Sequence, residues 1–93
     1  MISMSKPVYF VVVLSDVEAV RKRLREVVPE ETMVFEVDED KWFVSFDGIS
    51  RDLAEKLGIR GEPNIGSGIV IPVTSYSGRA NPALWEWLSL RMT

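Results

Sequence analysis

The sequence predicts an α+β domain whose elements run β-α-β-β-α-β, with an added helix at the C-terminus. Three observations predict it: an apolar run at 8–14 without polar alternation, two alternating segments around the polar stretch 38–41, and helical spacing of apolar residues between the strands. Ninety-three residues leave room for one domain. We therefore expect a single domain over 1–93, with residues 1–6 as a disordered tail.

The first strand and the first helix are predicted over 8–14 and 15–28. The apolar run is β-branched and aromatic, which is typical of a central strand covered on both faces. Ser15 and Glu18 have the spacing of a capping box, and Pro29 ends the helix. Between these limits the apolar residues recur at helical spacing, at Val17, Val20, Leu24, Val27 and Val28.

The middle of the chain predicts a β-hairpin and a short second helix. The segments 33–37 and 42–46 alternate, as two strands of a hairpin do. Ser50 is placed to cap a helix that carries Leu53 and Leu57, and Gly58 is placed to end it. A glycine-rich loop over 60–68 then precedes the last predicted strand, 69–73.

This order of elements is the split β-α-β arrangement of ferredoxin-like folds, whose antiparallel strands lie in the order 4-1-3-2. The sequence agrees with that order at both predicted edges. Glu36 and Asp38 put charges on the second strand, and Pro72 in the fourth lacks the N–H group that a central strand needs. The second and fourth strands are therefore predicted to be the edges of the sheet.

A third helix is predicted to begin at Asn81 and Pro82, which have the roles of N-cap and first-turn proline. Its apolar surface spans a wide arc formed by Leu84, Trp85, Trp87, Leu88, Leu90 and Met92. One small sheet leaves part of that arc uncovered, so we predict a subunit or partner interface at Trp85, Trp87 and Leu90. The alternative is that Trp87 folds over the sheet edge of its own chain.

Composition restricts the chemistry available to the chain. The absence of cysteine and histidine excludes a disulfide framework, a thiolate zinc site, a cysteine nucleophile and histidine-dependent hydrolysis. A chain without cysteine suits the cytoplasm, and its longest apolar run is too short to span a membrane. The formal net charge of −3 disfavours nucleic acid as a partner, because phosphate binding would then depend on a local basic patch.

One such patch is predicted on the first helix. Arg21, Lys22 and Arg25 share one side of it and offer a binding surface for phosphate or for an acidic partner. The other interpretation is a solvated outer face that pairs in part with Glu18 and Glu26.

Asp16 directly follows the first strand. The run into Ser15-Asp16-Val17, the hairpin strand Lys41-Trp42-Phe43-Val44, the capped second helix and the last strand before a helical tail resemble the small SinR-like proteins. These proteins are relatives of the CRISPR adaptation endonuclease subunit. In the endonuclease branch an aspartate at the end of strand one is the proposed metal ligand, with its twofold mate across a dimer, and Asp16 holds the matching position. The other interpretation of Asp16 is a first-turn charge that the helix dipole favours.

Two functions are therefore carried forward. The first is a small non-catalytic interaction or regulatory protein of the SinR-like kind, a homodimer without a cofactor and open to a protein partner. The alternative is a metal-dependent nuclease in which Asp16 binds Mg²⁺ at a dimer interface. A third class, a small-ligand sensor, leaves no trace that we identify in the sequence, and the fold alone does not decide among them.

Overall fold

The structure, a computed structural model, describes residues 6–92. The predicted tail, residues 1–6, lies outside this range apart from Lys6. The elements are β1 (Val8–Ser15), α1 (Val17–Val27), the 3₁₀ turn η1 (Glu31–Met33), β2 (Val34–Asp38), β3 (Lys41–Ser45), α2 (Ser50–Leu57), β4 (Ser67–Pro72) and α3 (Pro82–Arg91). The predicted order of helices and strands is thus confirmed, with η1 added before the hairpin.

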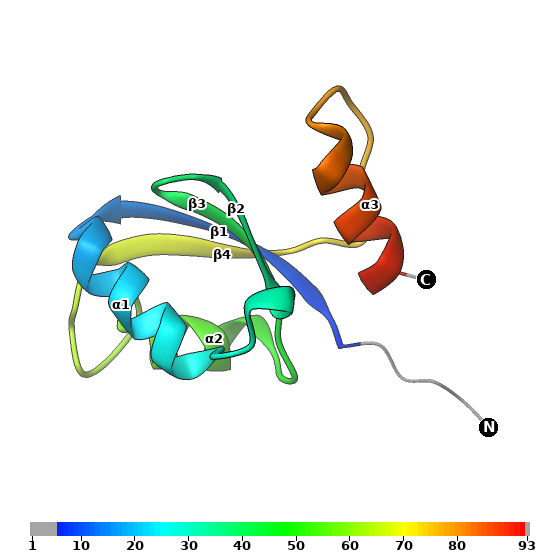
Figure 1. The fold of residues 1–93 in the computed structure, drawn as a ribbon. Helices are drawn as coiled ribbons and strands as arrows, with labels where there is room; N and C mark the ends of the chain where they lie inside the picture. The colour runs from blue at the N-terminus through cyan, green and yellow to red at the C-terminus, as the bar shows by residue number, and fades with distance from the viewer. Residues whose placement is uncertain (1–5, 93) are drawn as a thin grey trace.

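The four strands form one antiparallel sheet in the order β2-β3-β1-β4 (Figure 1). This is the predicted 4-1-3-2 order, and the α+β ferredoxin-like fold with an added C-terminal helix is confirmed. Pro72 ends β4 at one edge of the sheet, and Glu36 and Asp38 lie on β2 at the other. In the register of the sheet, Phe10 of β1 lies opposite Phe43 on one side and Ile71 on the other.

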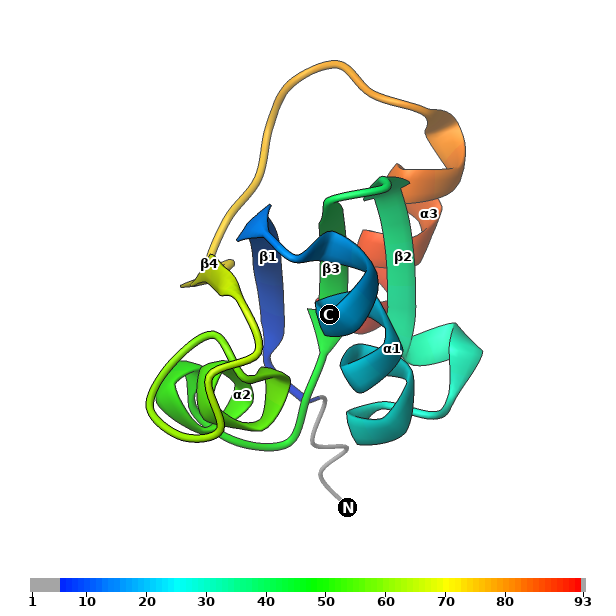
Figure 2. The same ribbon diagram turned by 90° about the vertical axis from the view of Figure 1, so that its left-hand side faces the viewer.

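The two helices α1 and α2 cover the same face of the sheet, which we call the helix face (Figures 1 and 2). Alternate residues of β1 and β3 point into this layer because side chains along a strand alternate between faces. There they meet the apolar stripes of the two helices. The resulting core is formed by Tyr9, Val11, Val13, Val20, Leu24, Trp42, Val44, Leu53 and Leu57.

The opposite face, which we call the open face, is covered at one end only. There α3 packs through Leu84 and Leu88 against Val8. Farther along β1, Val12 is half-buried and Leu14 is 63% exposed. The prediction that β1 is covered on both faces is therefore wrong over its second half, because one ten-residue helix does not reach the far end of the sheet. No helix within residues 6–92 is both long and apolar enough to cross a membrane.

The start of α1 differs from the predicted capping box. Ser15 still belongs to β1, where its Oγ accepts a hydrogen bond from the backbone N–H of Ser67 at 3.0 Å. Asp16 is the N-cap residue instead, in the left-handed region at φ 57°, and its side chain caps no backbone N–H. Ser15 therefore bonds to the neighbouring strand instead of capping the helix as the sequence pattern predicts.

The other predicted helix ends are mostly confirmed. Gly58 ends α2 at φ 78°, a conformation that glycine adopts without strain. The Oδ1 atom of Asn81 accepts a hydrogen bond from the backbone N–H of Ala83 at 2.9 Å and so caps α3. Ser50 is an exception, because it is the first residue of α2 and the N-cap is Ile49, without a side-chain hydrogen bond.

Candidate functional site

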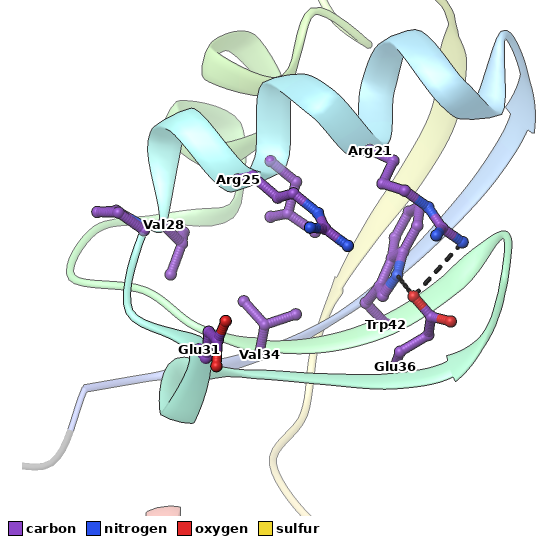
Figure 3. Close-up of a pocket in the computed structure, with 9 residues that line it drawn as sticks. Arg21, Arg25, Val28, Glu31, Val34, Glu36 and Trp42 are labelled. Carbon is purple, nitrogen blue, oxygen red and sulfur yellow. Dashed lines mark hydrogen bonds and ion pairs between the residues drawn. The ribbon is translucent and has the colours of Figure 1, made fainter.

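A groove on the helix face runs between α1 and the edge strand β2 (Figure 3). The cavity measures about 380 Å³. Its walls are Arg21, Leu24, Arg25 and Val28 from α1 and its end, Pro29 and Glu31 beyond it, Val34 and Glu36 from β2, and Trp42 from β3. The groove therefore combines an apolar floor with two cations and two carboxylates.

Arg21 forms a fixed wall of this groove. Its Nη2 atom lies 3.4 Å from Oε1 of Glu36 and donates to the backbone oxygen of Glu39 at 3.2 Å. Its guanidinium lies 6.0 Å from the ring centroid of Trp42, within the range of a cation–π contact. The Nε atom is buried and has no acceptor among the described residues. Arg21 is thus held from several sides by its own chain.

Trp42 forms part of the floor and anchors the same carboxylate. It is 2% exposed, and its Nε1–H donates to Oε1 of Glu36 at 3.3 Å. One carboxylate oxygen of Glu36 therefore serves both the indole and the guanidinium of Arg21. Glu36 was predicted only as an edge-protecting charge, and Trp42 was not predicted as a site residue.

Arg25 is the second cation of the groove and is placed differently. It lies one helical turn after Arg21, so the two side chains project from the same side of α1 (Figure 3). Within residues 6–92 its side chain makes no hydrogen bond or ion pair. The carboxylate of Glu31, which also lines the groove, is likewise without such a partner in that range. Arg25 and Glu31 are both exposed to solvent, so the groove holds one ion pair, Arg21 with Glu36, and one solvated charge of each sign.

The predicted basic patch is divided by the structure. Arg21 and Arg25 are brought together in the groove, whereas Lys22 is exposed and does not line it. Arg23 turns toward α2, where it donates to the backbone oxygen of Lys56 at 2.8 Å, and it lies 3.9 Å from Glu26. The expected partial pairing with Glu26 is therefore made by Arg23.

Asp16 lies in a second hollow at the end of β1. This cavity of about 410 Å³ is also lined by Ser15, Arg60, Asn64 and Ser67, among others, and it contains no second carboxylate. Asp16 is the one non-glycine residue among those described that has a positive φ. Within residues 6–92 no three acidic or other metal-binding side chains cluster together. In one chain, Asp16 thus offers a single carboxylate beside an amide and two hydroxyl groups.

The residues predicted as an interface on α3 have different surroundings. Trp87 donates through Nε1 to the backbone oxygen of Thr32 at 2.8 Å, and its ring centroid lies 6.2 Å from that of Phe35. It folds over the edge of its own sheet, as the alternative interpretation described. Trp85 stacks on Tyr76 at 5.6 Å between ring centroids. Leu90 is 63% exposed.

The open face carries an apolar row that crosses all four strands. Pairing in the sheet places Phe35, Phe43, Phe10 and Ile71 side by side, in that order. The rings of Phe10 and Phe43 are 4.8 Å apart. Helix α3 and the residues around it cover Phe35 and Phe43 in part. Ile71 is 45% exposed and Ile69 is 50% exposed. The β1–β4 half of this face is therefore apolar and uncovered.

Among the described strand residues, those on the open face that carry charge lie near the β2–β3 turn, where Lys41 is beside Val12 of β1. Asp38 lies opposite Lys41 in the register, and Nζ of Lys41 donates to Oδ1 of Asp40 at 2.9 Å. This hydrogen bond lowers the pKa of the Asp40 carboxyl and raises the pKa of the Lys41 ammonium. The centre of the face thus presents no unpaired charge.

The sequence contains signals for the groove on the helix face and for the uncovered half of the open face. Two arginines four residues apart on a helix, with Leu24 between them facing the core, indicate a charged rim beside an apolar floor. The uncovered face is indicated by Phe10, Phe43 and Ile71, which stand at strand positions facing away from two of the three predicted helices. No model of a protein family matches the chain, and a search of curated proteins finds no significant match.

Proposed function

We propose that this chain is a small non-catalytic interaction or regulatory protein of the SinR-like kind, which acts in the cytoplasm as a homodimer joined through the open face of its sheet. The observation that carries the proposal is the row of Phe10, Phe43 and Ile71, with Val12 and Ile69 beside it. A contiguous apolar surface of this kind on a small domain is typical of an association surface.

A second copy of the chain suits this surface because of the distribution of charge. In a twofold interface each side chain near the axis meets the same side chain or its neighbour from the other subunit. Like charges near the axis would oppose such pairing. Among the described strand residues the row from Phe43 to Ile71 has none, and Lys41, which lies beside Val12, is already bonded to Asp40. Two such faces can pack about 10 Å apart, as sheets do in sandwiches.

Sedimentation of the wild type and of Ile71→Lys tests the proposal. Ile71 lies on an edge strand and is 45% exposed, so lysine there is compatible with the folded monomer but places a charge in the dimer centre. We expect a dimer for the wild type at micromolar concentration and a monomer for the variant. Ala19→Lys is the matched control, because Ala19 is exposed on α1, which covers the helix face. A wild-type monomer, or a dimer that survives Ile71→Lys, would refute this assembly.

The interface predicted on α3 is tested in the same experiment by Leu90→Lys. Leu90 is the most exposed of the three residues named for it. If α3 extends the dimer interface, Leu90→Lys weakens the dimer less than Ile71→Lys does, because it lies outside the central row. An unchanged dimer would restrict the interface to the sheet.

A metal-dependent nuclease is the second candidate, and the backbone of Asp16 favours it. A non-glycine residue in the left-handed region, exposed at the end of a central strand, is typical of positions held for function. Magnesium commonly binds through one or two carboxylates together with substrate phosphate and water. Asp16 would supply one of these ligands, and a second subunit or the substrate the rest.

Asp16→Asn separates this candidate from the first. Asparagine tolerates the left-handed conformation, so the substitution removes the charge without disturbing the turn. Single- and double-stranded DNA and RNA are incubated with Mg²⁺ or Mn²⁺ and either protein. A nuclease requires cleavage by the wild type that Asp16→Asn abolishes. No cleavage by either protein, or equal cleavage by both, would remove this candidate.

A further inference from the structure

We infer that the groove between α1 and β2 binds a small zwitterion with an apolar side chain, the chemical class of a free apolar α-amino acid. The cavity of about 380 Å³ lies within the range of small-molecule sites and is lined from α1, the segment after it, and two strands. It is on the helix face, away from the open face of the sheet (Figure 3). This site is independent of the proposed dimer.

The charges in the groove identify the class of ligand. Glu36 already accepts from Arg21 and Trp42, although Nε of Arg21 has no acceptor among the described residues. Arg25 and Glu31 are exposed and have no partner within residues 6–92, so one cation and one carboxylate of the groove are accessible to a ligand. A ligand that is only an anion would bring its charge close to two carboxylates. A zwitterion pairs with both accessible groups, with its carboxylate on Arg25 and its ammonium on Glu31.

The floor of the groove provides for the apolar part of such a ligand. Leu24, Val28, Val34 and Trp42 line it between the charged groups. Arg21 is fixed by Glu36, by the backbone of Glu39 and by Trp42, so the wall beside the floor is ordered before a ligand arrives. A site that is ordered in advance loses less conformational freedom on binding.

Titration with L-phenylalanine, followed by the indole N–H signal of Trp42 in NMR spectra, tests this inference. The chain has three tryptophans, and Trp85→Phe and Trp87→Phe assign the Trp42 signal by elimination. We expect a saturable shift with a Kd between roughly 0.1 mM and a few mM, the affinity that so small a ligand can reach. Two probes complete the series: 3-phenylpropanoate, which lacks the amino group, and phenethylamine, which lacks the carboxylate. Each should bind about tenfold more weakly or worse.

Variants identify the side chains involved. Arg25→Gln should weaken L-phenylalanine about tenfold, because it removes the cation that meets the carboxylate. Glu31→Gln should weaken L-phenylalanine but not 3-phenylpropanoate, which loses a repelling carboxylate. Lys22→Gln is the matched control on the same helix, since Lys22 is exposed outside the groove, and it should change neither.

Three results would overturn the inference. They are the absence of a saturable shift of the Trp42 signal with L-phenylalanine, equal affinity for 3-phenylpropanoate and L-phenylalanine, and undiminished binding by Arg25→Gln. The Ile71→Lys variant shows whether binding depends on the dimer. It should bind L-phenylalanine as the wild type does, so failure of the dimer and failure of this site are seen separately.

Discussion

The two faces of the sheet differ in how completely they are covered, although the same strands supply both. On the helix face, Val11 is fully buried beneath α1 and α2. On the open face, its neighbour Val12 is half-buried, and Ile69 beside it is 50% exposed. The helix face is a core covered by two helices. The β1–β4 half of the open face has equally apolar residues, but no helix covers them.

This difference suggests where the stability of one chain resides and where association begins. The helix face buries nine apolar side chains in one cluster, and α3 on the other face buries only a few around Val8. Because hydrophobic stabilisation scales with the apolar area removed from water, the helix face supplies most of the stability of one chain. The open face has apolar area left to bury, and in our account a second chain buries it.

The largest effect is expected from truncation on the helix face. Leu53→Ala removes a fully buried side chain of α2 and should lower the free energy of unfolding by about 2–5 kcal/mol. Leu90→Ala is the matched control on α3, where the side chain is 63% exposed, and should change it by less than about 0.5 kcal/mol in the monomer. Urea unfolding of both variants measures the contrast. Equal losses would contradict the assignment of the core to the helix face.

A pair of neighbouring valines compares the two faces within one strand. Val11→Ala should lower the free energy of unfolding by about 2 kcal/mol at any protein concentration, since its contacts are within the chain. Val12→Ala should cost less than about 1 kcal/mol in dilute protein. Its loss should grow as the protein is concentrated, because the dimer buries Val12 further. A loss that is independent of concentration would place Val12 outside the interface.

A further effect concerns the hydroxyl group of Tyr9 on the helix face. Its hydroxyl donates to the backbone oxygen of Gly48, and burial first, then the nearby charge of Asp52, raises the pKa of Tyr9. Because the pKa of Tyr9 is higher in the folded than in the unfolded chain, the protonated hydroxyl stabilises the fold. This contribution is complete below the unfolded-state pKa of about 10 and is lost as the pH rises through the folded-state pKa. Tyr9→Phe should cost about 1 kcal/mol at neutral pH.

Urea unfolding at neutral pH and above about pH 10 follows this effect. The stability gap between the wild type and Tyr9→Phe should narrow as the pH rises, because only the wild type loses the Tyr9 contribution. A constant gap would show that Tyr9 titrates alike in the folded and unfolded chains.

Much of the fold could be predicted because local signals and sheet topology agree. Pro72 and the charges of Glu36 and Asp38 placed the edges correctly, and Gly58 and Asn81 marked helix ends through conformational preferences that are local. The prediction that Ser15 caps the first helix was wrong for a physical reason. Its hydroxyl can serve a strand as well as a helix, and the partner that decides between them, Ser67, is 52 residues away.

The candidate sites were harder to predict because they depend on distant segments. Arg21 and Arg25 were singled out from their spacing, but their different roles depend on Glu36 and Trp42, which come from the hairpin. Trp87 shows the same limit. The sequence of α3 predicts a wide apolar arc that includes Trp87. Only the folded chain shows that the Trp87 indole donates to the backbone oxygen of Thr32 and that its ring packs near Phe35.

The most direct measurement of the central claim is a search for contacts between subunits across the open face. Protein labelled at the isoleucine methyl groups is mixed with protein labelled at the phenylalanine rings, and nuclear Overhauser effects between the two are recorded. The proposed dimer predicts contacts between Ile69 or Ile71 of one subunit and Phe10 or Phe43 of the other, and none from Ile65, which packs against the core of the helix face. A dimer that shows contacts only from Ile65, or none from Ile69 and Ile71, would contradict the account.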